Sequence, residues 1–329
     1  MPGARVFMTP EGRPQQSDAG LHNQRIAVLI PCRNEALTIA NVIAEFRRSL
    51  DRASIWVCDN ASTDATAQRA VEAGADVVFE PRPGKGHAVR RLFAAVDADL
   101  YVLVDGDATY APDSAPAMLR KMLAEKLDMV VARRVTPDDS LSAAYRAGHV
   151  SANRGFARLI SLLFGYRLED IFSGYRVFSR RFVRSFPALS GGFEVETELT
   201  IHALDLDLPI AEVPSPYGVR PEGSSSKLHT YRDGLRITRT LLHLYAQVRP
   251  SRFYGSLAAL AALSSLALGL PVVFQFLETG LVPRLPTAVL ASALMVLAAL
   301  AFGSGIVLDS VGRGRKEAKR LAYLAADRR

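Results

Sequence analysis

Two carboxylates stand one residue apart, at Asp105 and Asp107, with Gly106 between them. The apolar run from Tyr101 to Val104 directly precedes them and predicts a short buried strand, because it is too short and too rich in β-forming residues for a helix. Oxygen ligands at this spacing suit Mg²⁺ or Mn²⁺, and such a cation can hold a diphosphate. A turn, with Asp and Gly serving only the backbone geometry, explains the same residues. The pair alone leaves both interpretations open.

The elements around this pair alternate between strands and helices. Strands are predicted at 26–30, 54–58, 76–79, 101–104 and 128–132. Helices are predicted between them, ending near residues 50, 73, 95 and 126, and Ser62 or Thr63 is expected to cap the second. This alternation implies parallel strands joined by right-handed crossovers, which is a doubly wound α/β sheet.

Polar residues cluster in four of the loops that follow these strands. They are Arg33, Asn34, Glu35, Asp59, Asp64, Lys85, Asp105 and Asp107. All such loops open on one edge of a doubly wound sheet, where ligands bind. A cap, a turn or a solvated charge explains each residue singly, but together they favour a nucleotide site, with Lys85 and a cation on the phosphates. The chain has no Gly-x-Gly-x-x-Gly and no Walker A sequence, so dinucleotide and ATP-hydrolysis functions lose support.

Composition sets wider bounds. Lys and Arg outnumber Asp and Glu by 40 to 33 over 329 residues, which suggests an anionic partner such as a nucleotide, a nucleic acid or a membrane surface. The two cysteines, Cys32 and Cys58, form no disulfide framework and fit a reducing compartment. Residues 1–24 are polar and predict a disordered lead-in rather than a signal peptide.

Four stretches between residues 26 and 135 occur in a characteristic order: Ile30-Pro-Cys-Arg-Asn-Glu-Ala, Val57-Cys-Asp-Asn-Ala-Ser-Thr-Asp, Gly84-Lys-Gly and Asp105-Gly-Asp. They resemble the GT-A nucleotide-sugar domain of family-two glycosyltransferases. The resemblance implies a nucleoside-diphosphate sugar as donor, Asp59 near its base, and Asp105 and Asp107 on the metal and diphosphate. The donor-binding residues that it implies here are Pro31, Arg33, Asn34, Glu35, Asp59, Asn60, Ser62, Asp64, Gly84, Lys85, Gly86, Asp105, Gly106 and Asp107.

Three later stretches narrow the resemblance. They are Asp170-Ile-Phe-Ser173-Gly174-Tyr175-Arg176, Gly192-Phe-Glu194-Val-Glu196, and Arg220-Pro-Glu-Gly223-Ser-Ser-Ser226-Lys227. They look like the polyprenyl-phosphate glycosyltransferases, the dolichyl-phosphate mannose synthase group. This resemblance implies that the second stretch helps to form the acceptor side. It also implies a mobile loop over the donor phosphates, with Arg220, Ser226 and Lys227 in that role. Thr109 stands where some relatives carry Gln, which leaves Asp105 and Asp107 as the expected side-chain metal ligands.

Residues on the acceptor side are harder to assign. The candidates for binding the acceptor phosphate are Arg134, Arg146, His149, Asn153, Arg154, Ser173, Gly174 and Arg176. Surface charge near a membrane explains any one of the basic residues equally well. Glu194 and Glu196 either orient sugar hydroxyls or mark the start of a helix.

Two uncharged stretches, 253–277 and 285–308, are each longer than the roughly 20 residues that span a bilayer core as a helix. Buried helices of a soluble core are the weaker alternative. Basic residues flank both stretches on the outside, which by the positive-inside rule predicts a transmembrane hairpin with both ends in the cytoplasm. Basic amphipathic segments at 145–166 and 228–248 either lie in the membrane interface or pack on the soluble domain.

These observations divide the chain into a lead-in (1–24), a GT-A domain (25–227), a juxtamembrane helix (228–250), a hairpin (253–308) and a basic cytoplasmic tail (309–329). The expected reaction is inverting transfer of a hexose-type sugar, with UDP the favoured nucleotide, to a polyprenyl phosphate at the cytoplasmic membrane. The expected catalytic groups are Asp105, Asp107, Arg220 and Lys227 with Mg²⁺ or Mn²⁺, and no protein base. A lipid bilayer is an expected partner, nucleic acid is not, and a homo-oligomer is left open. The alternatives are a sugar-nucleotide pyrophosphorylase and a non-enzymatic membrane scaffold or translocator subunit.

Overall fold

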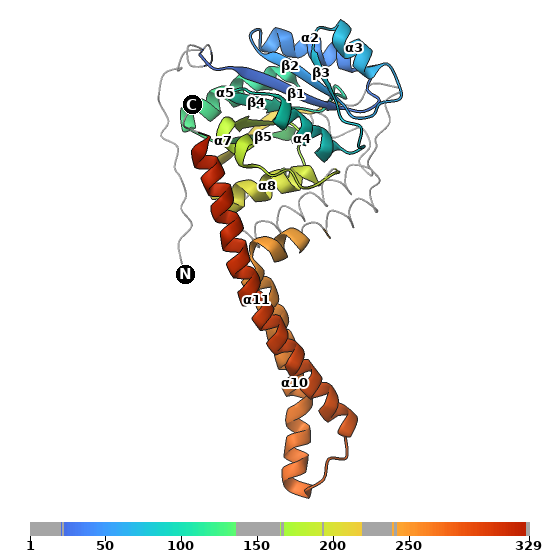
Figure 1. The fold of residues 1–329 in the computed structure, drawn as a ribbon, viewed down its shortest axis with the longest axis vertical. Helices are drawn as coiled ribbons and strands as arrows, with labels where there is room; N and C mark the ends of the chain where they lie inside the picture. The colour runs from blue at the N-terminus through green and yellow to red at the C-terminus, as the bar shows by residue number, and fades with distance from the viewer. Residues whose placement is uncertain are drawn as a thin grey trace.

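The computed structural model describes residues 21, 23–135, 165, 168–192, 194–218, 239 and 242–326. The predicted lead-in up to residue 20, and most of the two predicted amphipathic segments, lie outside these residues. Within them, a sheet covered by helices on both faces is followed by two long helices that project from it (Figure 1).

The first five strands alternate with helices, as predicted. The strands are β1 (Ile26–Cys32), β2 (Ser54–Asp59), β3 (Asp76–Phe79), β4 (Leu100–Leu103) and β5 (Met129–Val135). The helices between them are α2 (Ile39–Ser49), α3 (Thr66–Glu72), α4 (Lys85–Ala95), the 3₁₀ turn η1 (Pro112–Ser114) and α5 (Ala115–Glu125). The chain continues through β6 (Arg176–Ser179), α7 (Arg180–Ser185), α8 (Val195–Asp205) and β7 (Ile210–Pro216).

The sheet has the order β3-β2-β1-β4-β6-β5-β7. Every neighbouring pair is parallel except the two made by β6, which runs antiparallel to β4 and to β5. The predicted doubly wound, mostly parallel sheet is therefore confirmed. Because β1 lies between β2 and β4, the loops that follow these three strands are neighbours.

Alternate residues of β1 belong to two hydrophobic clusters, one on each face of the sheet, because successive side chains of a strand point to opposite faces. Val28 and Ile30 pack with α2, α3 and α5, whereas Ala27 and Leu29 pack with α4, α7 and α8 (Figure 1). All eleven residues of α8 are buried, including three carboxylates and a histidine. This helix is therefore an internal element that needs partners for its polar groups.

One predicted helix cap is wrong. Helix α3 begins at Thr66 with Ala65 at the N-cap position, so neither Ser62 nor Thr63 caps it. The Asp64 side chain instead accepts a hydrogen bond from the Thr66 backbone N–H. The preceding polar residues are occupied by contacts with the loop after β1, described below.

The two long helices are α10 (Pro250–Thr279) and α11 (Leu285–Ala325), and the predicted apolar spans fall within them. The most apolar windows of both have a mean hydropathy of 2.2, with only 17% and 11% of their residues buried, so neither is a core helix of a soluble domain. Inside the hairpin the Ser265 hydroxyl donates to the Ala291 carbonyl oxygen at 2.7 Å. Helix α11 has no break at Leu308 and continues through the predicted tail to Ala325.

Candidate active site

The ends of β1, β2 and β4 bring together the polar loops that the sequence separates. Pro31 lies within β1, and Arg33, Asn34 and Glu35 follow that strand. The backbone N–H of Asn60, after β2, donates to the Cys32 carbonyl oxygen of β1 at 2.8 Å. The Asp105–Asp107 loop follows β4 on the other side of β1. The predicted convergence at one sheet edge is therefore present.

The loop after β4 is held from both sides. The Thr38 hydroxyl donates to the Gly106 carbonyl oxygen at 2.6 Å, and a Cβ on Gly106 would lie 2.5 Å from the Cys32 sulfur, so only glycine fits there. Thr109 donates from its backbone N–H (3.2 Å) and its hydroxyl (2.6 Å) to Oδ1 of Asp107. Thr109 therefore orients the second carboxylate of the loop.

The ammonium of Lys85 joins this loop to α8. Its Nζ lies 2.5 Å from Oδ1 of Asp105 and 2.5 Å from Oε1 of Glu196. Burial by itself would lower the pKa of Lys85, but the charges of Asp105 and Glu196 outweigh burial and raise it. The lysine is therefore charged at neutral pH. A Cβ on Gly174 would lie 2.6 Å from Oδ2 of Asp105, and the Gly174 N–H donates to the Tyr110 hydroxyl at 2.9 Å. Gly174, a predicted acceptor-binding residue, thus lies against the predicted metal motif.

Two glycines at the start of α4 permit this arrangement. A Cβ on Gly84 would lie 2.1 Å from the Gly191 carbonyl oxygen, and one on Gly86 would lie 2.1 Å from that of Ser190. The Gly86 N–H donates to the Gly192 carbonyl oxygen at 3.2 Å. The glycines thus admit the loop before α8, which sets the start of α8 beside that of α4.

Three residues predicted to bind the donor tie the loops after β1 and β2 together. The Asn34 N–H donates to the Ser62 hydroxyl at 3.0 Å, and the Thr63 N–H donates back to the Asn34 side-chain oxygen at 2.7 Å. The Ala36 N–H donates to Oδ2 of Asp64 at 3.1 Å. These contacts give Asn34, Ser62 and Asp64 a structural role, and whether they also contact a donor stays a prediction.

Asn60 and Asp59 differ in how their side chains are satisfied. The Asn60 amide donates to the carbonyl oxygens of Glu80 and Arg82 and accepts from the Gly84 N–H, which fixes the loop after β3. Asp59 is 5% exposed, and its Oδ1 has no hydrogen-bond partner within the described part of the chain. An unsatisfied buried carboxylate oxygen is costly and indicates a site for an external hydrogen-bond donor.

Arg134, a predicted acceptor-binding residue, is held in a fixed position. Its guanidinium makes two hydrogen bonds of 2.8 Å to the Asp170 carboxylate and stacks on Tyr217 at 5.4 Å. Burial by itself would lower the pKa of Arg134, but the hydrogen bonds to Asp170 outweigh it and raise the pKa. The Asp170 N–H in turn donates to Glu212, so this arm of the site is preorganised.

Arg176 does not have the predicted role. It is fully buried, and its guanidinium donates to the carbonyl oxygens of Ser173 (2.8 Å) and Ile171 (2.6 Å) and to the Thr200 hydroxyl (2.9 Å). Ser173 is also fully buried. A side chain enclosed in this way has no surface for a ligand, which corrects the prediction that Arg176 and Ser173 bind the acceptor phosphate. Both residues shape the loop that carries Gly174.

The remaining predicted site residues lie outside the described residues: Arg146, His149, Asn153, Arg154, Arg220, Ser226 and Lys227. The sequence interpretation missed the roles of Tyr110 and Thr38, because a tyrosine and a threonine next to a polar motif are not distinctive. It named Glu196 as a sugar-hydroxyl ligand or a residue at the start of a helix, and missed its contact with Lys85.

The site supplies too few side chains to coordinate a cation alone, so a bound ligand would have to supply further coordinating oxygens. Within the described ranges, no group of three or more His, Cys, Asp or Glu side chains could hold a metal. The two carboxylates of Asp105 and Asp107 alone leave most of the roughly six positions of Mg²⁺ or Mn²⁺ to ligand oxygens and water. This donor set fits a metal bound through a diphosphate.

Comparison with known proteins decides the family. Residues 27–186 match the family model described as Glycosyl transferase family 2. Glycosyltransferase AglJ of Haloferax volcanii is 32% identical over 308 residues, covering 91% of this chain and 98% of that protein. The chain belongs to glycosyltransferase family 2. A further relative of this family-two enzyme, the dolichyl-phosphate hexose transferase of the same organism, is 29% identical over 68% of this chain and 95% of its own length.

Solved structures agree with the fold. Glucosyl-3-phosphoglycerate synthase from Mycobacterium tuberculosis, in complex with Mn²⁺, UDP-glucose and phosphoglyceric acid, superposes on this glycosyltransferase with a TM-score of 0.56. It is 27% identical and covers 72% of this chain and 86% of its own. The sheet is thus the GT-A type, and the family-two enzyme uses a nucleotide sugar.

Proposed function

We propose that this glycosyltransferase transfers a hexose-type sugar, with inversion, from a nucleoside diphosphate to a polyprenyl phosphate. The observation that carries the proposal is that one chain joins the Asp105–Asp107 edge to two exposed apolar helices of membrane-spanning length. The relative named dolichyl-phosphate hexose transferase supports the acceptor class.

On the donor side, the unpaired Oδ1 of Asp59 accepts a hydrogen bond from the nucleobase. UDP is the favoured nucleotide of the donor. Asp105 and Asp107 would hold Mg²⁺ or Mn²⁺, which would neutralise charge on the diphosphate. Lys85 keeps Asp105 in place, and Thr109 does the same for Asp107. Arg220, Ser226 and Lys227 remain predicted closing residues over the diphosphate.

On the acceptor side, a phosphate oxygen attacks the anomeric carbon while the bond from that carbon to the diphosphate oxygen breaks. Direct displacement inverts the anomeric configuration. A phosphate monoester has a second pKa of about 6, so it attacks as a dianion and needs no protein base. Arg134 is the described cation best placed to orient this phosphate, since Asp170 fixes it and its side chain remains 28% exposed.

The two long apolar helices α10 and α11 support a reaction at a bilayer. Basic residues flank the hairpin outside both apolar stretches, so we place the catalytic domain and both termini on the cytoplasmic side of the cytoplasmic membrane. The lipid acceptor then presents its phosphate at the same surface.

The test is incubation of the purified full-length protein in detergent with undecaprenyl phosphate and a panel of radiolabelled nucleotide sugars. We expect organic-extractable label with one of the donors, and none with Asp107→Asn. Pyrophosphate-dependent cleavage of the nucleotide sugar to sugar 1-phosphate and nucleoside triphosphate, without labelled lipid, would instead identify a pyrophosphorylase. Failure of every donor to yield labelled lipid or nucleotide turnover would contradict the proposal.

A further inference from the structure

The end of α11 is docked on the catalytic domain far from the apolar hairpin. The Tyr323 hydroxyl donates to Oδ2 of Asp128 at 2.8 Å, and the Arg181 guanidinium stacks on the Tyr323 ring at 4.9 Å. Asp128 is fully buried, and the Tyr323 ring packs against the core cluster that contains α7 and α8. The Lys319 ammonium donates to Asp205 at 3.1 Å. This contact surface is therefore partly enclosed and specific in geometry.

A second set of contacts lies lower on the same helix. The Arg315 guanidinium donates to the Gln247 carbonyl oxygen at 3.1 Å, and a Cβ on Gly312 would lie 3.5 Å from that oxygen. Gln247 belongs to the juxtamembrane segment, whose Leu244 and Val248 pack against the domain core. The two separated attachments on one continuous helix therefore fix its direction relative to the domain. Tyr323 lies 15 residues beyond Leu308, about 22 Å farther along the helix axis.

The docked end lies at the sheet edge opposite to the site. Asp128 directly precedes β5, and Asp205 is the last residue of α8, which β7 follows, so both lie near the amino ends of strands. Asp105 and Asp107 follow the carboxyl end of β4. Contacts at the far edge cannot touch a substrate, so any effect on transfer acts through orientation.

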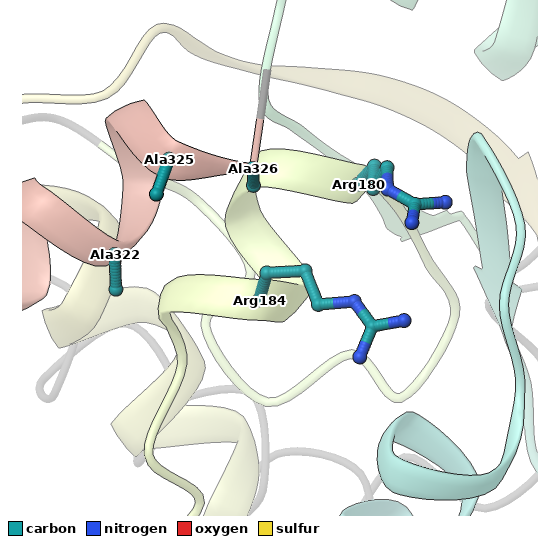
Figure 2. Close-up of a pocket in the computed structure, with 5 residues that line it drawn as sticks. All are labelled: Arg180, Arg184, Ala322, Ala325 and Ala326. Carbon is teal, nitrogen blue, oxygen red and sulfur yellow. The ribbon is translucent and has the colours of Figure 1, made fainter. Parts of the chain in front are cut away.

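A pocket of about 290 Å³ lies where the end of α11 meets α7, but its lining does not indicate a ligand site. It is lined by Ala322 and Ala325 of α11, by the C-cap residue Ala326, and by Arg180 and Arg184 of α7 (Figure 2). Both arginine side chains extend away from α11 and contact Asp97, at 2.7 and 2.6 Å. The cations of the pocket are thus already paired within the protein.

We infer that residues 312–325 of α11 form a positioning arm that holds the transfer edge at a fixed height and orientation over the bilayer. This inference rests on the proposed function for its acceptor. A rigid link from lipid to domain brings the site to a phosphate confined to the membrane surface, which a freely tumbling domain meets rarely. The arm contributes nothing to a short acceptor that diffuses freely.

The experiment compares two acceptors, undecaprenyl phosphate in liposomes and a short water-soluble prenyl phosphate. For Lys319→Ala combined with Tyr323→Ala, we expect a fall of about tenfold in the liposome rate, and short-acceptor rates and UDP affinity within about twofold of wild type. Arg320→Ala removes a charge from an exposed position of the same helix and serves as the matched control. Asp205→Lys and Lys319→Asp should each lower the liposome rate, and together restore it. Unchanged liposome rates, or equal losses with both acceptors, would overturn the inference.

A second measurement needs no sugar transfer and so separates this inference from the proposed function. Spin labels on Arg52→Cys in the domain and Leu297→Cys in α11 report the distance between domain and hairpin. We expect a narrow distance distribution in liposomes that broadens in the Lys319→Ala, Tyr323→Ala variant. A distribution equally narrow in that variant would refute the arm even if no acceptor were turned over.

Discussion

Lys85 begins α4 and Asp105 lies in the loop after β4, and their charged atoms lie 2.5 Å apart. Glu196 completes the group from α8, so one buried cation is shared by two carboxylates. Removing that cation would leave the negative charges of Asp105 and Glu196 close together, and the Glu196 side chain is only 6% exposed.

The Lys85→Met variant should therefore have a lower free energy of unfolding and should lose sugar-transfer activity. Breaking a buried ion pair costs about 3–5 kcal/mol, and the partial exposure of Asp105 places the expected loss near the lower end. Urea unfolding and initial rates measure both effects. Glu196→Gln combined with Lys85→Met removes one of the stranded charges and should recover stability but not activity. A wild-type unfolding midpoint in Lys85→Met would contradict the ion-pair account.

Gly106→Ala tests the packing behind the metal motif. The new Cβ would meet the Cys32 sulfur at 2.5 Å, and overpacking of this kind costs about 1–3 kcal/mol. The displaced loop should lower activity by at least about tenfold. Cys32→Ala removes the obstructing sulfur, so the double variant should regain much of the activity that Gly106→Ala loses. If the double variant is as impaired as Gly106→Ala, the clash is not the cause.

Asp107→Asn should abolish transfer with little change in thermal stability, and calorimetry should show weakened Mn²⁺ binding in the presence of UDP. Thr109→Val should have a smaller effect, about tenfold in rate, because it removes only the hydroxyl that orients Asp107. Thr109→Ser retains the hydroxyl and is the control. Full activity of Asp107→Asn in chelator would exclude the metal assignment.

The free energy of unfolding should decrease as the pH falls, because His202 is buried in its neutral form. Burial lowers the pKa of this histidine to about 3 in the folded protein, with the charge of Lys319 as a smaller cause, whereas the unfolded chain titrates near 6.5. Because the unfolded state binds the proton first, the stability present above pH 6.5 is lost progressively as the pH falls toward 3. His202→Gln should flatten this dependence between pH 7 and 5 in urea unfolding. An equally steep dependence in the variant would assign the loss to other groups.

Sequence patterns predicted the first half of the fold well because they are local. The buried run before Asp105 and the spaced apolar residues of α2 identify a strand and a helix without knowledge of their partners. The placement of β6 between β4 and β5 was not predictable in this way, because strand pairing depends on distant residues. The site shows the same division, since the convergence of the loops followed from topology but the Lys85–Glu196 contact did not.

Arg176 shows why residue type alone misleads. A guanidinium suits phosphate and buried carbonyl oxygens equally, and only burial distinguishes these uses. The helical continuation of α11 through a basic segment was missed for a related reason, since the aspartates that receive its lysines are more than 100 residues away.

The insertion of β6 has a consequence for biosynthesis. Strands β4 and β5 emerge from the ribosome before the strand that joins them, and their facing edges remain unpaired until residues 176–179 are made. Unpaired strand edges are prone to associate with other chains. A nascent chain stalled shortly after β5 should therefore be bound by chaperones, and one stalled well beyond β6 should be released from them.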